Sequence, residues 1–371
     1  MSERNPLLRL RDLGQSVWYD YIRRDLYAGE ELRRLIREDG LAGMTSNPTI
    51  FQKAIADTDL YDDAVRRSGG EETDPSAVFE SLAVEDVRAA ADVFRSVFDK
   101  AGGNDGFVSI EVGPRLANDT EGSVQEAQRL WEKCARENVM VKIPGTSAGI
   151  PAIRRCLADG ININITLLFS VSRYREVMEA YLSALEERVA AGRPIDRLRS
   201  VASFFVSRVD SNVDKKLDRI GTDAARALRG KAAIANARLA YVAFREVFGS
   251  DRFKRLAERG GAIQRPLWAS TSTKDPSYPD LYYVEALVAS DSVDTMPPET
   301  LEAYRDHGDP KVRISDDLEG ASETFRRLAA LGIDEATVSR ELEEEGVKKF
   351  SDSYDSLLKA LAEKEKAMRV A

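Results

Sequence analysis

The chain has 371 residues, 43% of them hydrophobic, which is enough to bury a large α/β core. Its net charge of −9 comes from interspersed acidic and basic residues, and we expect no nucleic-acid partner because no basic stripe is present. The sequence also has no apolar run near the roughly 18 residues of a membrane span and no signal-peptide pattern at its start.

Eight short apolar runs alternate with longer amphipathic segments, and this alternation predicts an α/β fold, a (β/α)8 TIM-type barrel. A doubly wound sheet is disfavoured because no G-x-G-x-x-G motif follows a predicted strand. The charged tail, 310–371, is predicted to be a helical extension packed on the barrel, so that 1–371 form a single domain. In chain order, the predicted strands are 17–21, 41–45, 107–112, 139–143, 161–167, 200–206, 265–271 and 282–288.

Helical periodicity marks four of the intervening segments. The first follows a predicted loop, 68–76, in which Asp74 is the expected N-cap and Pro75 the first helical residue. The predicted helices are 77–100, 124–137, 173–190 and 224–248.

The histidine and cysteine content limits the chemistry. His307 is the single histidine, and it lies in a polar stretch typical of a surface loop. Ser-His-Asp hydrolysis and histidine-bound zinc are therefore disfavoured. The two cysteines, Cys134 and Cys156, occur in helix-like contexts and cannot form a disulfide framework. These features predict a cytoplasmic protein.

Polar side chains occupy one face of the fifth predicted strand. Asn162, Asn164 and Thr166 alternate with isoleucines, which form the opposite face. A wet strand face would explain this pattern in an antiparallel sheet. In a parallel barrel both faces are covered, so we expect the polar row to point inward and to line a site.

The same alternation places three ionisable side chains inside the barrel near strand ends. Asp20, Glu111 and Lys142 belong to the first, third and fourth predicted strands. A lysine that ends a strand usually reaches solvent, but Lys142 lies between apolar residues and no histidine competes with it. A desolvated lysine favours its neutral form and attacks carbonyls. Magnesium is disfavoured because it prefers more carboxylates than Asp20 and Glu111, so no metal or cofactor is expected.

An anion pocket is predicted after the sixth and seventh strands. Ser203 and Phe205 share the inner face of the sixth strand, and Arg208 follows it. The seventh strand leads into a run of hydroxyl residues that ends with Lys274. Hydroxyls with Arg208 and Lys274 suit a phosphate group, and barrels often bind phosphate at these loops. Serine- and threonine-rich turns with solvated charges are the alternative.

Five motifs, in order, resemble those of the transaldolase family over about 17–298. They are VWYDYI, GMTSNPTIF, SIEVGPRL, VKIPGT and NINITLLFS. The resemblance assigns Lys142 as the Schiff-base lysine, Asp20 as acid–base group and Glu111, followed by Arg115, as the catalytic glutamate. It also gives Asn47, Asn164 and Thr166 as site residues. The chain departs from some relatives in SFFVSR, and in WASTSTKDP, where we expect Lys274 to replace an arginine near Ser272.

The resemblance implies transfer of a dihydroxyacetone unit through a lysine Schiff base in the pentose phosphate pathway. The expected donors are sedoheptulose 7-phosphate and fructose 6-phosphate, and the acceptors are glyceraldehyde 3-phosphate and erythrose 4-phosphate. A fructose 6-phosphate aldolase is an alternative, although those relatives carry a tyrosine where Glu111 would act. A catalytically inactive phosphosugar-binding barrel is a second alternative. The oligomeric state is left open between monomer and homodimer.

Overall fold

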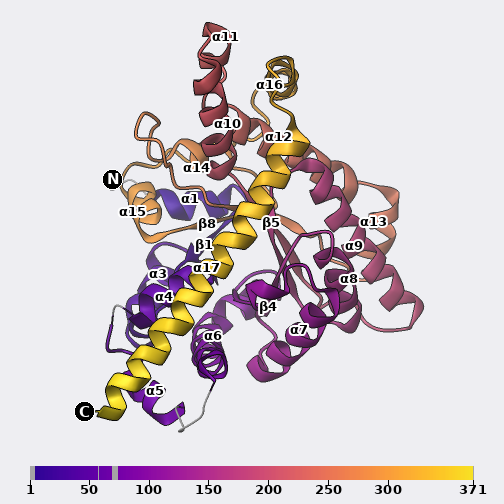
Figure 1. The fold of residues 1–371 in the computed structure, drawn as a ribbon. Helices are drawn as coiled ribbons and strands as arrows, with labels where there is room; N and C mark the ends of the chain where they lie inside the picture. Colours follow the sequence, from indigo (N-terminus) through magenta and orange to yellow (C-terminus); the bar gives the residue numbers. More distant parts are fainter. Residues whose placement is uncertain (1–4, 57, 69–73, 371) are drawn as a thin grey trace.

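The structure is a computed structural model that describes residues 5–56, 58–68 and 74–370. Within these residues, eight parallel strands close into a barrel in chain order, with β8 pairing back to β1 (Figure 1). The predicted (β/α)8 barrel is confirmed. The strands are β1 (Gln15–Asp20), β2 (Gly43–Thr45), β3 (Phe107–Glu111), β4 (Val139–Pro144), β5 (Ile163–Leu168), β6 (Ser200–Phe205), β7 (Arg265–Ala269) and β8 (Ser292–Met296).

Helices surround the barrel. Those of the first half are α1 (Pro6–Asp12), α2 (Arg24–Ala28), α3 (Glu31–Glu38), α4 (Pro48–Ala56), α5 (Asp62–Ser68), α6 (Pro75–Lys100), the 3-10 turn η1 (Pro114–Leu116), α7 (Thr120–Cys134), α8 (Gly149–Asp159) and α9 (Val171–Ala190). Those of the second half are α10 (Ser207–Ile220), α11 (Asp223–Arg226), α12 (Ala232–Phe248), α13 (Asp251–Ala257), α14 (Tyr282–Ala286), α15 (Pro298–His307), α16 (Leu318–Ala330) and α17 (Glu335–Val370).

The start of α6 follows its sequence signals. The side chain of Asp74 accepts a hydrogen bond from the backbone N–H of Ser76, and Pro75 occupies the first turn. Both predictions for this helix are confirmed, because an N-cap carboxylate satisfies a free N–H and proline needs no helical partner there. Residues 69–73 of the predicted loop lie outside the described residues.

The eighth strand was predicted at the wrong place. Residues 282–288 contain the short helix α14, and β8 is Ser292–Met296. The buried residues of the first segment, Tyr283, Val284 and Leu287, have helical spacing. The true strand was missed because it is short and its polar residues, including Asp294, made it look like an exposed loop. In the structure these polar side chains are buried in the barrel.

The predicted helix 224–248 is also two helices. α11 ends at Arg226 and α12 begins at Ala232, with Gly230 between them at φ 69°. Carboxylates of α10 accept hydrogen bonds in this gap: Asp214 from the N–H of Gly230 and Asp210 from the N–H of Ala233. The start of α12 is thus capped by another helix and not by its own sequence.

The long helix α17 crosses the barrel at the carboxyl ends of the strands (Figure 1). It contacts α4 and α6 along one part of its length and α10 along another. Lys216 of α10 forms an ion pair with Glu341 at 2.6 Å, and Lys364 forms one with Asp62 of α5 at 2.6 Å. The helix is therefore fixed at both sides of the barrel mouth. No described helix combines the length and the apolar character needed to cross a bilayer.

The cysteines and the histidine occupy the surroundings expected of them. Cys134 and Cys156 are buried free thiols in α7 and α8. The side chain of His307 is 51% exposed and lies 3.2 Å from Asp280, so it is a surface residue as predicted. It is the last residue of α15, however, and does not lie in a loop.

Candidate active site

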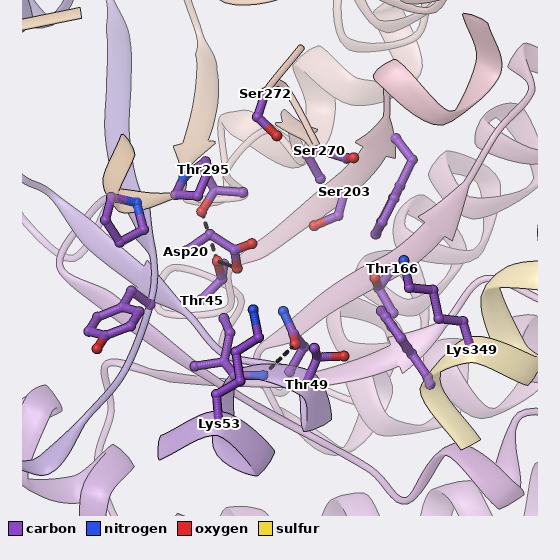
Figure 2. A pocket seen from close by; sticks show the side chains of 18 of the residues that line it. Asp20, Thr45, Thr49, Lys53, Thr166, Ser203, Ser270, Ser272, Thr295 and Lys349 are labelled. Atoms are coloured by element: carbon purple, nitrogen blue, oxygen red, sulfur yellow. Dashed lines mark hydrogen bonds between the residues drawn. The ribbon is translucent and has the colours of Figure 1, made fainter. Parts of the chain in front are cut away.

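A cavity of about 570 Å³ opens at the carboxyl ends of the strands (Figure 2). It brings together side chains from most of the barrel strands and from α4, α10 and α17. Eight of the ten predicted site residues line it, and Glu111 and Asn164 lie beside it. The eight are Asp20, Asn47, Lys142, Thr166, Ser203, Phe205, Arg208 and Lys274.

Lys142 points into the barrel from β4. It is 5% exposed, and its Nζ donates a hydrogen bond of 3.0 Å to the carbonyl oxygen of Ser46. Its Nζ also lies 3.5 Å from Oε2 of Glu111, the residue directly opposite it on β3. The amine is thus held by two neighbouring strands and turned away from bulk solvent. The buried, inward-facing placement predicted from the sequence is thus confirmed, and the reaction of this amine with a carbonyl stays a prediction.

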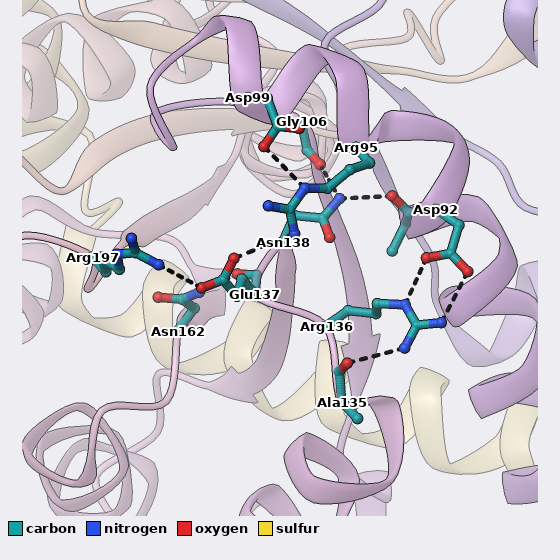
Figure 3. Close-up of polar contacts among 11 residues, drawn as sticks. Asp92, Arg95, Asp99, Gly106, Ala135, Arg136, Glu137, Asn138, Asn162 and Arg197 are labelled. Atoms are coloured by element: carbon teal, nitrogen blue, oxygen red, sulfur yellow. Dashed lines mark hydrogen bonds and ion pairs between the residues drawn. The ribbon is translucent and has the colours of Figure 1, made fainter.

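The amino end of β4 is fixed by polar contacts (Figure 3). Asn138, just before the strand, is fully buried and donates to the carbonyl oxygens of Ala91 and Gly106 at 2.8 and 2.9 Å. Arg136 forms an ion pair with Asp92 of α6 at 2.6 Å. Since a shift of one residue would turn Lys142 to the other face of the sheet, these contacts secure the position of the amine.

Asp20 lies at the end of β1, on the same cavity. The hydroxyl of Thr45 donates a 2.7 Å hydrogen bond to its Oδ1, and Thr45 itself is 2.7 Å from the hydroxyl of Thr295. Figure 2 shows these three side chains in a line across β1, β2 and β8. With one proton on each hydroxyl, Thr295 must donate to Thr45 when Thr45 donates to Asp20. The line orients the carboxylate toward the cavity.

Burial changes the proton affinity of both carboxyl groups. Burial raises the pKa of Asp20, and Lys142 and the hydrogen bond from Thr45 oppose that rise. Burial also raises the pKa of Glu111, again opposed by the nearby Lys142. Both groups therefore hold a proton to higher pH than exposed carboxyls, which suits them to proton transfer.

A hydrogen-bonded row of polar side chains lies inside the barrel next to Lys142. Asn164 is fully buried, donates to Ser109 at 3.0 Å and accepts from Ser203 at 2.7 Å. Thr166 is fully buried and lines the cavity, and its hydroxyl has no hydrogen-bond partner among the described residues. The hydroxyl is therefore free to bind a ligand or a water molecule.

Asn47 lies just before α4. Its Oδ1 accepts a hydrogen bond of 3.0 Å from the backbone N–H of Ile50 and so caps the helix. The side-chain NH₂ remains as the group that can donate into the cavity.

Two residues that the sequence placed near the site lie elsewhere. Asn162 precedes β5 at its amino end, where it donates to the carbonyl of Glu137 and accepts from the N–H of Arg199. Asn162 therefore supports the backbone. The polar row runs along the barrel axis, and Thr166, at the carboxyl end of β5, reaches the cavity. Arg115 is exposed and forms an ion pair with Asp355 of α17 at 2.5 Å.

Positive charges gather at one corner of the cavity. The guanidinium of Arg208 lies over the ring of Phe205 at 5.0 Å, and Lys274 donates a 2.6 Å hydrogen bond to the hydroxyl of Ser272. Burial lowers the pKa of both Arg208 and Lys274. Two cations and a hydroxyl are thus brought together from the ends of β6 and β7, as predicted for a phosphate pocket.

Sequence reasoning missed several lining residues. Thr45 ends β2 and Thr295 is the last residue but one of β8, and the parity argument applied to β2 could have found Thr45. Ser270 belongs to the predicted run of hydroxyl residues, but its φ of 57°, a backbone conformation seldom adopted by residues other than glycine, was not predicted. Lys349 and Phe350 come from α17, far along the chain, and only the packing of that helix brings them to the cavity.

The chain is similar to known proteins over almost its whole length. The family model described as Transaldolase/Fructose-6-phosphate aldolase matches residues 17–361. A transaldolase of Frankia alni is 49% identical over 360 residues, 97% of each chain, and one of Saccharopolyspora erythraea is 49% identical over 98% of each. A transaldolase of Mycolicibacterium smegmatis is 47% identical over 97% of each chain. The chain belongs to the transaldolase/fructose-6-phosphate aldolase family.

Proposed function

We propose that this protein is a transaldolase that moves a dihydroxyacetone unit between sugar phosphates through a Schiff base on Lys142. The observation that carries the proposal is the buried amine of Lys142, 3.5 Å from Glu111 and in one cavity with Asp20. The three relatives compared above, all named transaldolase, support the transfer reaction. The two buried free thiols fit a reducing cytoplasm as the place of action.

The first proposed step forms the covalent bond to the substrate. The neutral amine of Lys142 adds to the C2 carbonyl of a ketose phosphate, and the carbinolamine then loses its oxygen as water to give a protonated imine. Glu111 supplies the proton that turns the departing hydroxyl into water, and Thr166 holds that water. The raised pKa of Glu111 suits it to carry this proton.

The second step cleaves the sugar. Asp20 accepts the proton of the C4 hydroxyl, the C3–C4 bond breaks, and its electron pair moves into the imine to give an enamine. The aldose phosphate leaves, and Asn47 and Asn164 hold the retained three-carbon unit. An incoming aldose phosphate is attacked by the enamine in the reverse sequence, so the kinetics are ping-pong. Ser203 and Phe205 line the cavity wall, and Arg208 and Lys274 bind the phosphate.

The family description also includes fructose 6-phosphate aldolase, which would release dihydroxyacetone to solvent. The transferase is favoured because a carboxyl group, Glu111, lies beside the lysine where the aldolases are expected to have a tyrosine. Release of free dihydroxyacetone is compared with its transfer to glyceraldehyde 3-phosphate or erythrose 4-phosphate. Release faster than transfer would assign the aldolase reaction.

Borohydride trapping tests the Schiff base. The protein is incubated with fructose 6-phosphate and sodium borohydride, and the modified peptide is mapped by mass spectrometry. We expect one adduct, on Lys142, and none in the Lys142→Arg variant. Lys53, exposed on α4 at the same cavity, provides the control, because Lys53→Arg should be trapped like the parent protein. An adduct that persists in Lys142→Arg would overturn the assignment, and no adduct at all would favour a non-catalytic binding barrel.

A further inference from the structure

The C-terminal helix α17 forms one wall of the cavity. Gly346 is buried, and a Cβ at that position would lie 2.9 Å from the side chain of Leu167 at the end of β5, so the helix approaches the barrel rim closely there. Lys349, Phe350 and Ser353 follow at helical spacings of three, four and seven residues and hence share this face. Both Lys349 and Phe350 line the cavity.

This wall is held in place and is not a loose lid. The hydroxyl of Ser353 is 2.9 Å from that of Thr49 on α4, and Tyr354 is 2.9 Å from Ser76 on α6. These contacts flank the face that meets the cavity. Together with the ion pairs at either side of the barrel mouth, they fix where Lys349 and Phe350 stand.

Phe350 contacts the phosphate-pocket arginine. The guanidinium of Arg208 lies 5.8 Å from the centre of the Phe350 ring and 5.0 Å from that of Phe205. The guanidinium is thus flanked by an aromatic ring of β6 and one of α17. Aromatic faces attract a guanidinium and limit its rotation, and Phe350, 5% exposed, is itself fixed by packing.

Lys349 adds a third positive charge to the same corner. Its amine extends from α17 toward the side of the cavity that carries Thr166 (Figure 2). Among the described residues, Lys349 has no ion-pair partner, whereas the next lysine on the helix, Lys348, is paired with Asp352 at 2.5 Å. The charge of Lys349 also acts on Lys274 across the corner. Repulsion among these cations falls when an anion binds between them.

We propose that α17 completes the phosphate site: Lys349 binds the phosphate group of the sugar substrate, and Phe350 is a positioning residue that holds Arg208 toward it. The proposal rests on the proposed transaldolase function for the identity of the ligand. It makes the C-terminal helix part of substrate recognition, with one direct contact and one indirect one.

The test compares Lys349→Gln with Lys348→Gln, a matched loss of charge one residue away that does not line the cavity. With saturating fructose 6-phosphate, we expect Lys349→Gln to raise the KM for erythrose 4-phosphate about tenfold, as for one charge-assisted contact, with kcat little changed. The KM for unphosphorylated erythrose should stay at the parent value. Lys348→Gln should match the parent protein with both acceptors.

Phe350→Leu tests the positioning role. We expect a higher KM for the phosphorylated acceptor only. Adding Phe350→Leu to Arg208→Gln should cause little further loss, because Phe350 acts through the guanidinium that Arg208→Gln has already removed. If Phe350 had a purely structural role, Phe350→Leu would raise the KM for both acceptors alike and lower the melting temperature of the protein.

Three outcomes overturn the proposal: equal KM values for Lys349→Gln and Lys348→Gln, equal losses with both acceptors, or full additivity of Phe350→Leu with Arg208→Gln. Titration with inorganic phosphate separates this result from the reaction itself. If the parent protein has no transaldolase activity, the proposed function fails. Weaker phosphate binding by Lys349→Gln than by Lys348→Gln would still support the site, and equal binding would refute it.

Discussion

Lys142 and Glu111 are direct partners across the β3–β4 pair, and the amine of the lysine lies 3.5 Å from the carboxyl of the glutamate. Both side chains are 6% exposed. An amine and a carboxyl group this close together, both buried, are placed to pass a proton between them or through one water molecule. The pair is therefore suited to the formation and the hydrolysis of an imine.

Replacing Glu111 by glutamine should slow imine formation but leave the lysine in place. The amide cannot deliver a proton to the departing hydroxyl, and general acid–base groups contribute about 10²- to 10⁴-fold to rate. We expect a loss in this range in the single-turnover rate of borohydride-trapped adduct, with the adduct still on Lys142. A parent-like rate would remove Glu111 from the mechanism.

The pH dependence of kcat/KM should report the ionisation of Asp20. A base must be ionised to accept a proton, so activity is lost as the pH falls through its pKa. Burial raises that pKa above the ordinary value, and the acidic limb is therefore expected at higher pH than for an exposed aspartate.

Removing the hydroxyl of Thr45 should shift the acidic limb of the kcat/KM profile. It donates to Asp20 and favours the ionised form, so Thr45→Val is expected to raise the pKa further and to shift the acidic limb upward. Thr45→Ser, which keeps the hydroxyl, is the control. An unchanged limb in Thr45→Val would mean that a group other than Asp20 controls the profile.

Asp294 should make the protein less stable as the pH rises. It is fully buried, its Oδ1 accepts from Thr271, and burial raises its pKa from 3.8 to about 7. The folded state thus binds a proton more tightly than the unfolded chain, and this contribution is complete below pH 3.8 and lost as the pH rises to about 7.

The Asp294→Asn variant should remove that dependence. Over this interval, the free energy of unfolding of the parent protein should fall by about 1.4 kcal/mol per pH unit more than that of the variant. Urea denaturation at several pH values provides the measurement. The control is Asp291→Asn, at an exposed position three residues earlier in the chain. It should retain the parent protein's dependence of unfolding free energy on pH. Parallel curves for parent and Asp294→Asn would contradict the assignment.

Gly43→Ala should destabilise the barrel. A Cβ there would lie 2.5 Å from the indole of Trp18, which is fully buried and donates to Asp105 at 2.8 Å. The ring cannot move without losing that bond, so we expect a loss of about 1–3 kcal/mol in the free energy of unfolding. Gly113→Ala, where the nearest atom is at 3.5 Å, is the comparison and should cost less. Equal losses would show that Trp18 gives way.

The sequence alone determined the barrel and the three ionisable side chains at its centre. Strand side chains alternate strictly, so parity was enough to place Asp20, Glu111 and Lys142 on inner faces. The cap at Asp74 could also be predicted, because capping depends on neighbours within one turn. The family motifs added the roles expected of these residues.

Other features were decided only by tertiary structure. β8 could not be recognised because its polar residues find partners elsewhere in the barrel: Asp294 on Thr271, just after β7, and Thr295 on Thr45 of β2. The line from Thr295 through Thr45 to Asp20 joins three strands, and Phe350 reaches Arg208 from the far end of the chain. Periodicity and capping act within a few residues, whereas these contacts depend on how distant elements pack, and no local pattern encodes that.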